Sequence, residues 1–231
     1  MRNLFVTRAA AADIVRSGAV ALFAGSEAAL ATLPTGTWIG GTTAYFMTEH
    51  GGAIDTERLF CTIIDTAVVA RGAHFAPDAL ASLATGQYRN GFTYVLVPGQ
   101  SAAHRRYALE SLCFPDLFTQ PVMGWVTGTP ADDPNARAPK VFFGPTGEAF
   151  EDKMLALYIR LPDGIVAEVD TVNLFTQGFG PRNRLPAHRF LRRRMPGRRR
   201  PRHDRTLFRR LRHPPAPGRR LCRASWSTSP C

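Results

Sequence analysis

The most distinctive stretch of this chain that could carry chemistry is a pair of glycines followed by hydroxyl side chains, Thr37-Trp38-Ile39-Gly40-Gly41-Thr42-Thr43-Ala44-Tyr45-Phe46. The pattern predicts a strand over residues 37–41 that runs into a glycine turn. Glycines at a strand end let a ligand approach the backbone closely, and in open α/β sheets ligands bind beyond the carboxyl ends of strands. We therefore expect a small-ligand pocket built from Gly40, Gly41, Thr42, Thr43 and Tyr45. The alternative is a tight turn capped by the threonine hydroxyls.

A second candidate is the start of a predicted helix after Gly99. Ser101 is a suitable N-cap, and the free N–H groups of a helix N-terminus favour an anion. His104 and Arg105 follow within the first turn and could reinforce an anion-binding site. The alternative is an ordinary capped helix whose basic side chains face water.

Motifs of known catalytic or cofactor sites are missing from the sequence. The chain has no G-x-S-x-G nucleophile elbow, no H-x-x-x-H metal spacing, no G-x-G-x-x-G fingerprint and no P-loop lysine. We therefore expect no catalytic residues, no metal and no cofactor. The remaining enzyme hypothesis is a reaction on an anionic small substrate that uses Ser101, His104 and Arg105.

Helix and strand signals alternate over the first part of the chain. Helices are predicted at residues 9–17, at 27–33 after the N-cap Ser26, at 77–83 with Pro77 in the first turn, and at 101–113 with Ser101 as the N-cap. Apolar runs rich in β-branched and aromatic residues predict strands at 19–23, 37–41, 59–64, 92–97 and 122–126.

The second part of the chain favours strands. Residues 127–139 are polar and rich in proline, which predicts a loop. Residues 153–160 and 165–175 flank the turn sequence Leu161-Pro162-Asp163-Gly164, and together they predict an antiparallel hairpin. The fold class is therefore α/β, with a mixed sheet and flanking helices in the first part and a β-rich antiparallel second part.

The strand that leads into Gly-Gly-Thr-Thr at residues 40–43, early in an α/β domain, resembles the N-terminal part of FIST sensory domains. The order of elements over about residues 20–177 is similar in layout, including the hairpin near residues 153–175. The chain is too short for the complete two-part layout of that family. The resemblance implies a bacterial module that binds a small ligand in signal transduction, and the only residues it carries over are Gly40–Thr43.

Charge divides the chain at Gly178. Residues 1–177 hold 12 Lys and Arg against 17 Asp and Glu, whereas residues 178–231 hold 17 Arg and one acidic residue, Asp204. The net charge is therefore −5 before the break and +16 after it. We expect a single domain at 1–177 and a disordered Arg- and Pro-rich tail at 178–231.

Two explanations of the tail remain open. As a native basic arm, it would bind nucleic acid through phosphate contacts. As a C-terminus translated out of frame, it would have no function. The second is favoured because the tail contains 8 prolines and because Arg codons of the CGN type become Val, Ala, Asp, Glu or Gly codons when read one base later. Nucleic acid is therefore expected as a partner only if the tail is native.

Compartment and membrane association follow from the apolar segments and the cysteines. Cys61 and Cys113 lie in apolar contexts without C-x-x-C spacing, so we expect two buried free thiols. No apolar run approaches the roughly 18–20 residues of a membrane span. A cytoplasmic protein with an unknown small molecule as its partner, and without a membrane anchor, is the expectation.

Overall fold

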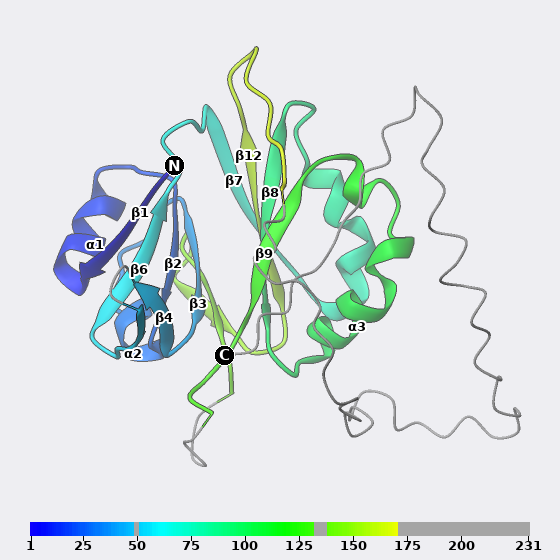
Figure 1. Ribbon diagram of the computed structural model, residues 1–231. Helices are drawn as coiled ribbons and strands as arrows, with labels where there is room; N and C mark the ends of the chain where they lie inside the picture. The colour runs from blue at the N-terminus through cyan, green and yellow to red at the C-terminus, as the bar shows by residue number, and fades with distance from the viewer. Residues whose placement is uncertain (49–50, 132–137, 171–231) are drawn as a thin grey trace, which may run out of the picture. The chain divides into compact units, whose positions relative to one another are not determined.

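The computed structural model describes residues 1–48, 51–131 and 138–170, and Met1–Val169 form one compact unit. Two sheets lie face to face in this unit, and helices cover the outer face of each sheet (Figure 1). The order of layers is therefore helix, sheet, sheet, helix. This arrangement confirms the α/β class with mixed sheets and flanking helices. The tail at 178–231, predicted to be disordered, lies outside the described residues.

The first sheet has six strands in the order β1-β6-β2-β3-β10-β11. Their bounds are β1 Arg2–Thr7, β6 Arg58–Ile63, β2 Ala21–Gly25, β3 Trp38–Thr42, β10 Val141–Phe143 and β11 Glu148–Phe150. Only β2 and β3 pair in parallel; all other neighbours are antiparallel. The sheet therefore combines strands from the beginning and the end of the domain.

The second sheet has four strands in the order β7-β12-β8-β9. They span Val69–Phe75 (β7), Met154–Arg160 (β12), Gly91–Pro98 (β8) and Val122–Thr127 (β9). The pairs β7–β12 and β12–β8 are antiparallel, and β8–β9 is parallel. A separate hairpin joins β4 (Tyr45–Thr48) to β5 (Gly51–Ile54).

The three α-helices of the described residues are short, and each begins at a side-chain cap. Thr7 caps α1 (Arg8–Arg16), Ser26 caps α2 (Glu27–Leu30), and Ser101 caps α3 (Ala102–Glu110). Each of these hydroxyls accepts a hydrogen bond from a backbone N–H of the first turn, which would otherwise lack a partner. The 3₁₀ segments are η1 (Pro77–Gly86), η2 (Ser111–Cys113) and η3 (Leu117–Thr119).

Three apolar clusters correspond to the three gaps between layers. The first lies between α1, α2 and the six-stranded sheet and includes Trp38 and Phe23. The second fills the space between the sheets, and the third lies between the four-stranded sheet and the segments η1 and α3. Both sheets are therefore covered on both faces, which explains why β2, β3 and β12 consist almost entirely of buried residues.

The predicted hairpin of residues 153–160 with residues 165–175 is wrong. Strand β12 is hydrogen-bonded to β7 on one side and to β8 on the other, so it has no free edge for the segment that follows. Residues 165–170 form no strand, and 171–175 lie outside the described residues. The alternation of apolar and polar residues predicted a half-buried strand here, but among residues 165–170 only Ala167 packs against the core between the sheets.

Six strands of the described residues had no counterpart among the sequence-based predictions, and one of them is β1 at the edge of the first sheet. Strands β4 and β5 are half exposed, and β10 and β11 have three residues each. Strand β7 contains Arg71 and His74 and alternates weakly. Such strands are held by pairing with a neighbour rather than by their own composition.

The two cysteines of the domain differ in their surroundings, although both were expected to be buried. Cys61 is fully buried in β6, and this burial raises the pKa of its thiol to about 12, whereas Cys113 is exposed. We predict that iodoacetamide at about pH 8 alkylates Cys113 and leaves Cys61 unmodified, because the thiolate is the reactive form. Peptide mapping by mass spectrometry distinguishes the two sites, and labelling in denaturant is the control. Equal labelling of both cysteines in the native protein would contradict the buried position of Cys61.

Candidate functional site

The two glycines of the first predicted site are packing positions within β3. A Cβ atom added at Gly40 would lie 3.0 Å from Cδ2 of Leu30, in the cluster beneath the helices. A Cβ atom at Gly41 would lie 2.4 Å from Cγ2 of Thr127, on the other face of the sheet. Both faces of β3 are therefore occupied by protein atoms where a side chain would otherwise begin. The glycines permit close approach, as expected, but the approaching group is another part of the same chain.

The hydroxyl groups that follow are also used within the protein. Thr42 is buried, and its Oγ1 accepts a hydrogen bond from the Lys140 N–H at 2.9 Å. Thr43 Oγ1 accepts from the Tyr45 N–H at 3.3 Å, and the Tyr45 hydroxyl accepts from the Ala131 N–H at 2.7 Å. These bonds agree with the alternative of a capped turn. Ligand binding by residues 40–45 stays a prediction.

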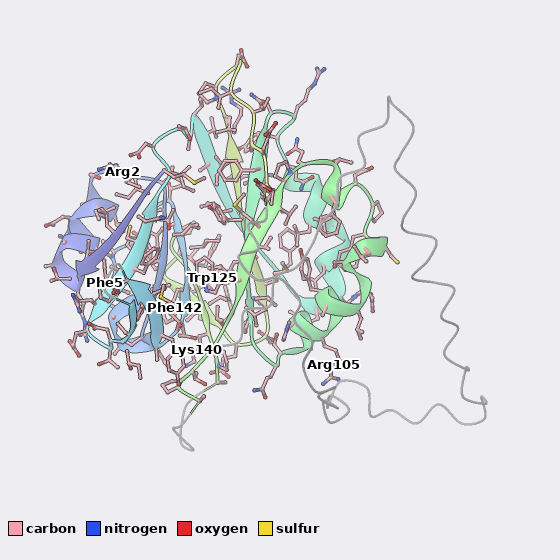
Figure 2. All side chains as sticks on the ribbon, viewed as in Figure 1. Arg2, Phe5, Arg105, Trp125, Lys140 and Phe142 are labelled. Atoms are coloured by element: carbon pink, nitrogen blue, oxygen red, sulfur yellow. The ribbon has the colours of Figure 1, made fainter. Side chains whose placement is uncertain are left out.

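Backbone hydrogen bonds bring the ends of three strands together near this turn. The Gly128 N–H donates to the Thr42 carbonyl at 2.9 Å, and the Gly99 N–H donates to the Thr127 carbonyl at 3.1 Å. The carboxyl ends of β3, β9 and β8 are thereby joined in one chain of contacts. Figure 2 shows Trp125 of β9 between the two sheets and Arg105 on the outer, helical side. The two sites predicted from sequence thus lie at strand ends linked by hydrogen bonds.

Lys140 forms an ion pair with two carboxylates beside this junction. Its Nζ lies 2.7 Å from Oε1 of Glu27 and 3.3 Å from Oε1 of Glu151. The hydrogen bond to Glu27 is the main reason that the pKa of Lys140 is raised, with a smaller contribution from Glu151. The pairing links the first turn of α2 to the chain around β10 and β11. It compensates the lysine charge within the protein.

The second predicted site is a capped helix start. Ser101 Oγ accepts from the His104 N–H at 3.0 Å and donates to the Pro98 carbonyl at 2.7 Å. The Nδ1 atom of His104 accepts from the Gln100 N–H at 3.2 Å, and burial lowers the pKa of this imidazole. Arg105 is exposed on the first turn. Ser101 and His104 therefore hold the turn that enters α3, as the alternative of an ordinary capped helix predicts.

The structure contains a hollow that no sequence motif indicated. It has a volume of about 540 Å³ and is lined by Tyr88, Arg89, Asn90, Arg160, Leu161 and Asp163. The lining comes from the residues before β8 and from the end of β12 with the turn that follows it. The hollow is thus at the amino end of β8, whereas Ser101 follows the carboxyl end of the same strand. An eight-residue strand spans roughly 23 Å, so the hollow and the predicted sites are well separated along β8.

Contacts within the chain hold the walls of the hollow. The side-chain amide of Asn90 donates to the Pro162 carbonyl at 2.9 Å, and the Leu161 N–H donates to the Asn90 carbonyl at 3.0 Å. The side-chain amide of Gln120 donates to the Tyr88 carbonyl. The two bonds of Asn90 connect the turn at 161–164 to the segment that enters β8, and the bond of Gln120 connects that segment to the residues before β9. The turn sequence was recognised from the sequence, but its position beside Arg89 depends on the pairing of β12 with β8.

The described residues include neither a metal cluster nor a membrane-spanning helix. No group of three or more His, Cys, Asp or Glu side chains there could hold a metal ion. Among the helices of the same residues, none has the length and apolarity needed to cross a membrane.

Fold and hollow together define a four-layer α/β domain with a depression, lined by charged, polar and aromatic residues, at one end of its second sheet. Residues 6–195 match the model of DUF6976, a family of unknown function, and the chain belongs to that family. No curated protein and no solved structure matches the chain. The family match ends within the Arg- and Pro-rich segment, and a shifted reading frame after Gly178 stays a prediction that the nucleotide sequence tests.

The packing role of Gly41 can be tested by substitution. We predict that Gly41→Ala lowers the free energy of unfolding by about 1–3 kcal/mol, because the new methyl group meets Thr127 Cγ2. Gly128→Ala is the matched control, since no atom lies within 4 Å of a Cβ at that position. Thr127→Ser removes Cγ2 and should reduce the cost of Gly41→Ala in a double-mutant cycle measured by urea unfolding. A fully stable Gly41→Ala protein would contradict close packing at this position.

His104 gives a prediction for the pH dependence of stability. Its pKa is lowered in the folded state from the ordinary 6.5, so the unfolded chain takes up a proton before the folded protein does. The stabilisation by neutral His104 is therefore present above about pH 6.5 and is lost as the pH falls. Urea unfolding at about pH 7.5 and pH 5.5 should show a larger acid-induced loss in the native sequence than in His104→Gln. Parallel losses in the two proteins would exclude this role of His104.

Proposed function

We propose that this domain is a non-catalytic module that binds a small ligand and acts as a sensor in signal transduction. The observation that carries the proposal is the hollow at the end of β8 and β12, with its polar and aromatic lining. Its volume falls within the range of small-molecule sites, roughly 300–1,000 Å³. The resemblance of residues 40–43 and of the element order to FIST sensory domains supports the same class of function.

The use of the potentially reactive side chains also favours binding over catalysis. Ser101 is occupied as a helix cap, and His104 Nδ1 accepts a backbone hydrogen bond. Burial raises the pKa of Cys61 to about 12, which keeps this thiol protonated and unreactive near neutral pH. The hypothesis of an enzyme that uses Ser101, His104 and Arg105 has no further supporting observation. Nucleic-acid binding would depend on residues 178–231, and these lie outside the residues that the structure describes.

The hollow is a better candidate for the ligand site than the end of β3. At Gly41 the space above the backbone is filled by Thr127 and Trp125. At the hollow, Tyr88 and Asn90 are half-buried, while Arg89 and Asp163 are exposed. A ligand at the hollow would contact side chains without displacing the packing between the sheets.

A ligand screen on the full chain tests the proposal. We predict that at least one compound from a panel of neutral, cationic and anionic metabolites raises the melting temperature and binds in calorimetry. Asp163→Ala should change its affinity by about threefold or more, because this exposed carboxylate lines the hollow. Thr42→Val removes the side-chain hydrogen bonds to Lys140 at the end of β3 and changes no residue of the hollow, so it should leave the affinity unchanged.

Two results would contradict the proposal in different ways. If no compound in the panel binds, the domain is not a small-ligand module. If Thr42→Val abolishes binding and Asp163→Ala has no effect, the ligand binds at the strand end that the sequence indicated.

A further inference from the structure

The two arginines that line the hollow differ from most other arginines of the described residues in their contacts. Arg89 and Arg160 line it together, and in the described part of the chain neither takes part in an ion pair or a side-chain hydrogen bond. By contrast, five other arginines pair with carboxylates: Arg2 with Asp65, Arg8 with Glu57, Arg16 with Asp13, Arg58 with Asp55 and Arg106 with Glu110. Carboxylates outnumber basic residues in residues 1–177, so a shortage of acidic partners does not explain the two exceptions.

Strand register explains why Arg160 reaches the hollow. Residues alternate between the two faces of β12, and Ile159 and Leu161 belong to the cluster between the sheets. Arg160 therefore lies on the opposite face, with Tyr158 of the cluster beneath η1 and α3. Its partner in the ladder is Gly91, where an added Cβ would lie 1.9 Å from the Ile159 carbonyl oxygen. The backbone at Ile159 thus occupies the space where a side chain would begin, so Gly91 contributes no side chain beside Arg160.

The remaining lining gives the hollow a defined polarity. Asp163 also lines it, and this carboxylate is not ion-paired with Arg89 or Arg160 within the described residues. Two guanidinium groups and one carboxylate leave an excess of one positive charge. Tyr88 adds an aromatic ring that is partly buried against the third cluster. The charges thus favour an anion, while the ring offers apolar surface to the rest of a ligand.

We propose that the hollow binds an anionic small molecule through a carboxylate or phosphoryl group held by Arg89 and Arg160. This inference rests on the proposed binding function and specifies its ligand class. Guanidinium groups present fixed pairs of N–H donors that match the oxygens of both groups. Asp163 opposes the bound negative charge and limits affinity for compounds with a second anionic group near the turn at 161–164.

Titration of the full chain followed by NMR tests the inference residue by residue. The probes are methyl phosphate and acetate, with glycerol as a neutral probe and methylammonium as a cationic one. Residue-resolved signals are needed because residues 178–231 contain 17 Arg that also attract anions. We expect at least one anionic probe to shift the amide signals of residues 88–91 and 160–163. The better of the two anions identifies the group as phosphoryl or carboxylate.

Some substitutions are expected to weaken anion binding and one to strengthen it, and this difference distinguishes direct ligand contact from a general effect on the structure. Arg89→Gln and Arg160→Gln should each weaken anion binding roughly tenfold, and the corresponding Lys variants should bind with intermediate affinity because they keep only the charge. Asp163→Asn should strengthen binding. Arg16→Gln is the control, because Arg16 is paired with Asp13 at an exposed position of α1. All four sites are exposed, so the melting temperatures should stay close to that of the native sequence.

The outcomes distinguish this inference from the proposed function. If glycerol or methylammonium shifts the signals of the hollow and neither anion does, the domain still binds a ligand there but the anionic class is wrong. If both anions shift only signals from residues 178–231, or if the two Gln variants bind as tightly as the native sequence, the inference is overturned. If no probe and no compound of the metabolite panel binds at the hollow, the proposed function fails together with it.

Discussion

The close approach of neighbouring layers to β3 is the constraint on which this domain depends. Gly40 allows Leu30 of α2 to approach one face of the strand, and Gly41 allows Thr127 of β9 to approach the other. Side chains at these positions would force apart the helix layer or the second sheet. Packed interiors tolerate few voids. The distance of each neighbouring layer from β3 therefore also determines how closely side chains pack in the clusters on its two faces. The glycine pair is therefore a requirement of the layered fold.

Strand β12 has a comparable role in the second sheet, because it is paired on both sides and buried over nearly its whole length. Its residues alternate between the cluster that joins the sheets and the cluster beneath η1 and α3. Only at its end does the strand reach the surface, where Arg160 replaces the apolar pattern. The hollow forms at this point because, on the face of Arg160, the cluster beneath η1 and α3 ends at Tyr158, so a polar side chain can follow there.

Much of the secondary structure could be predicted from the sequence because local signals were strong. Ser26 and Ser101 cap helices as their patterns indicated, and the apolar runs of β2, β6 and β8 form strands. Short strands such as β10 and β11 were missed, since pairing with neighbours holds them. The segment after Gly164 was wrongly predicted as a strand because alternation cannot reveal that both edges of β12 are already occupied.

By itself, the sequence determined the class of the fold, the caps and turns, and the charge boundary at Gly178, since each depends on residues close together in the chain. It also indicated that Gly40 and Gly41 accept close approach. Only the tertiary structure decided that Thr127 makes this approach to Gly41. It likewise brought Arg89 beside Arg160, which are 71 positions apart. The physical reason is that β8 and β12 pair because their residues are buried together, although they lie far apart in the chain. No local sequence pattern indicates which residues meet at the end of that pair.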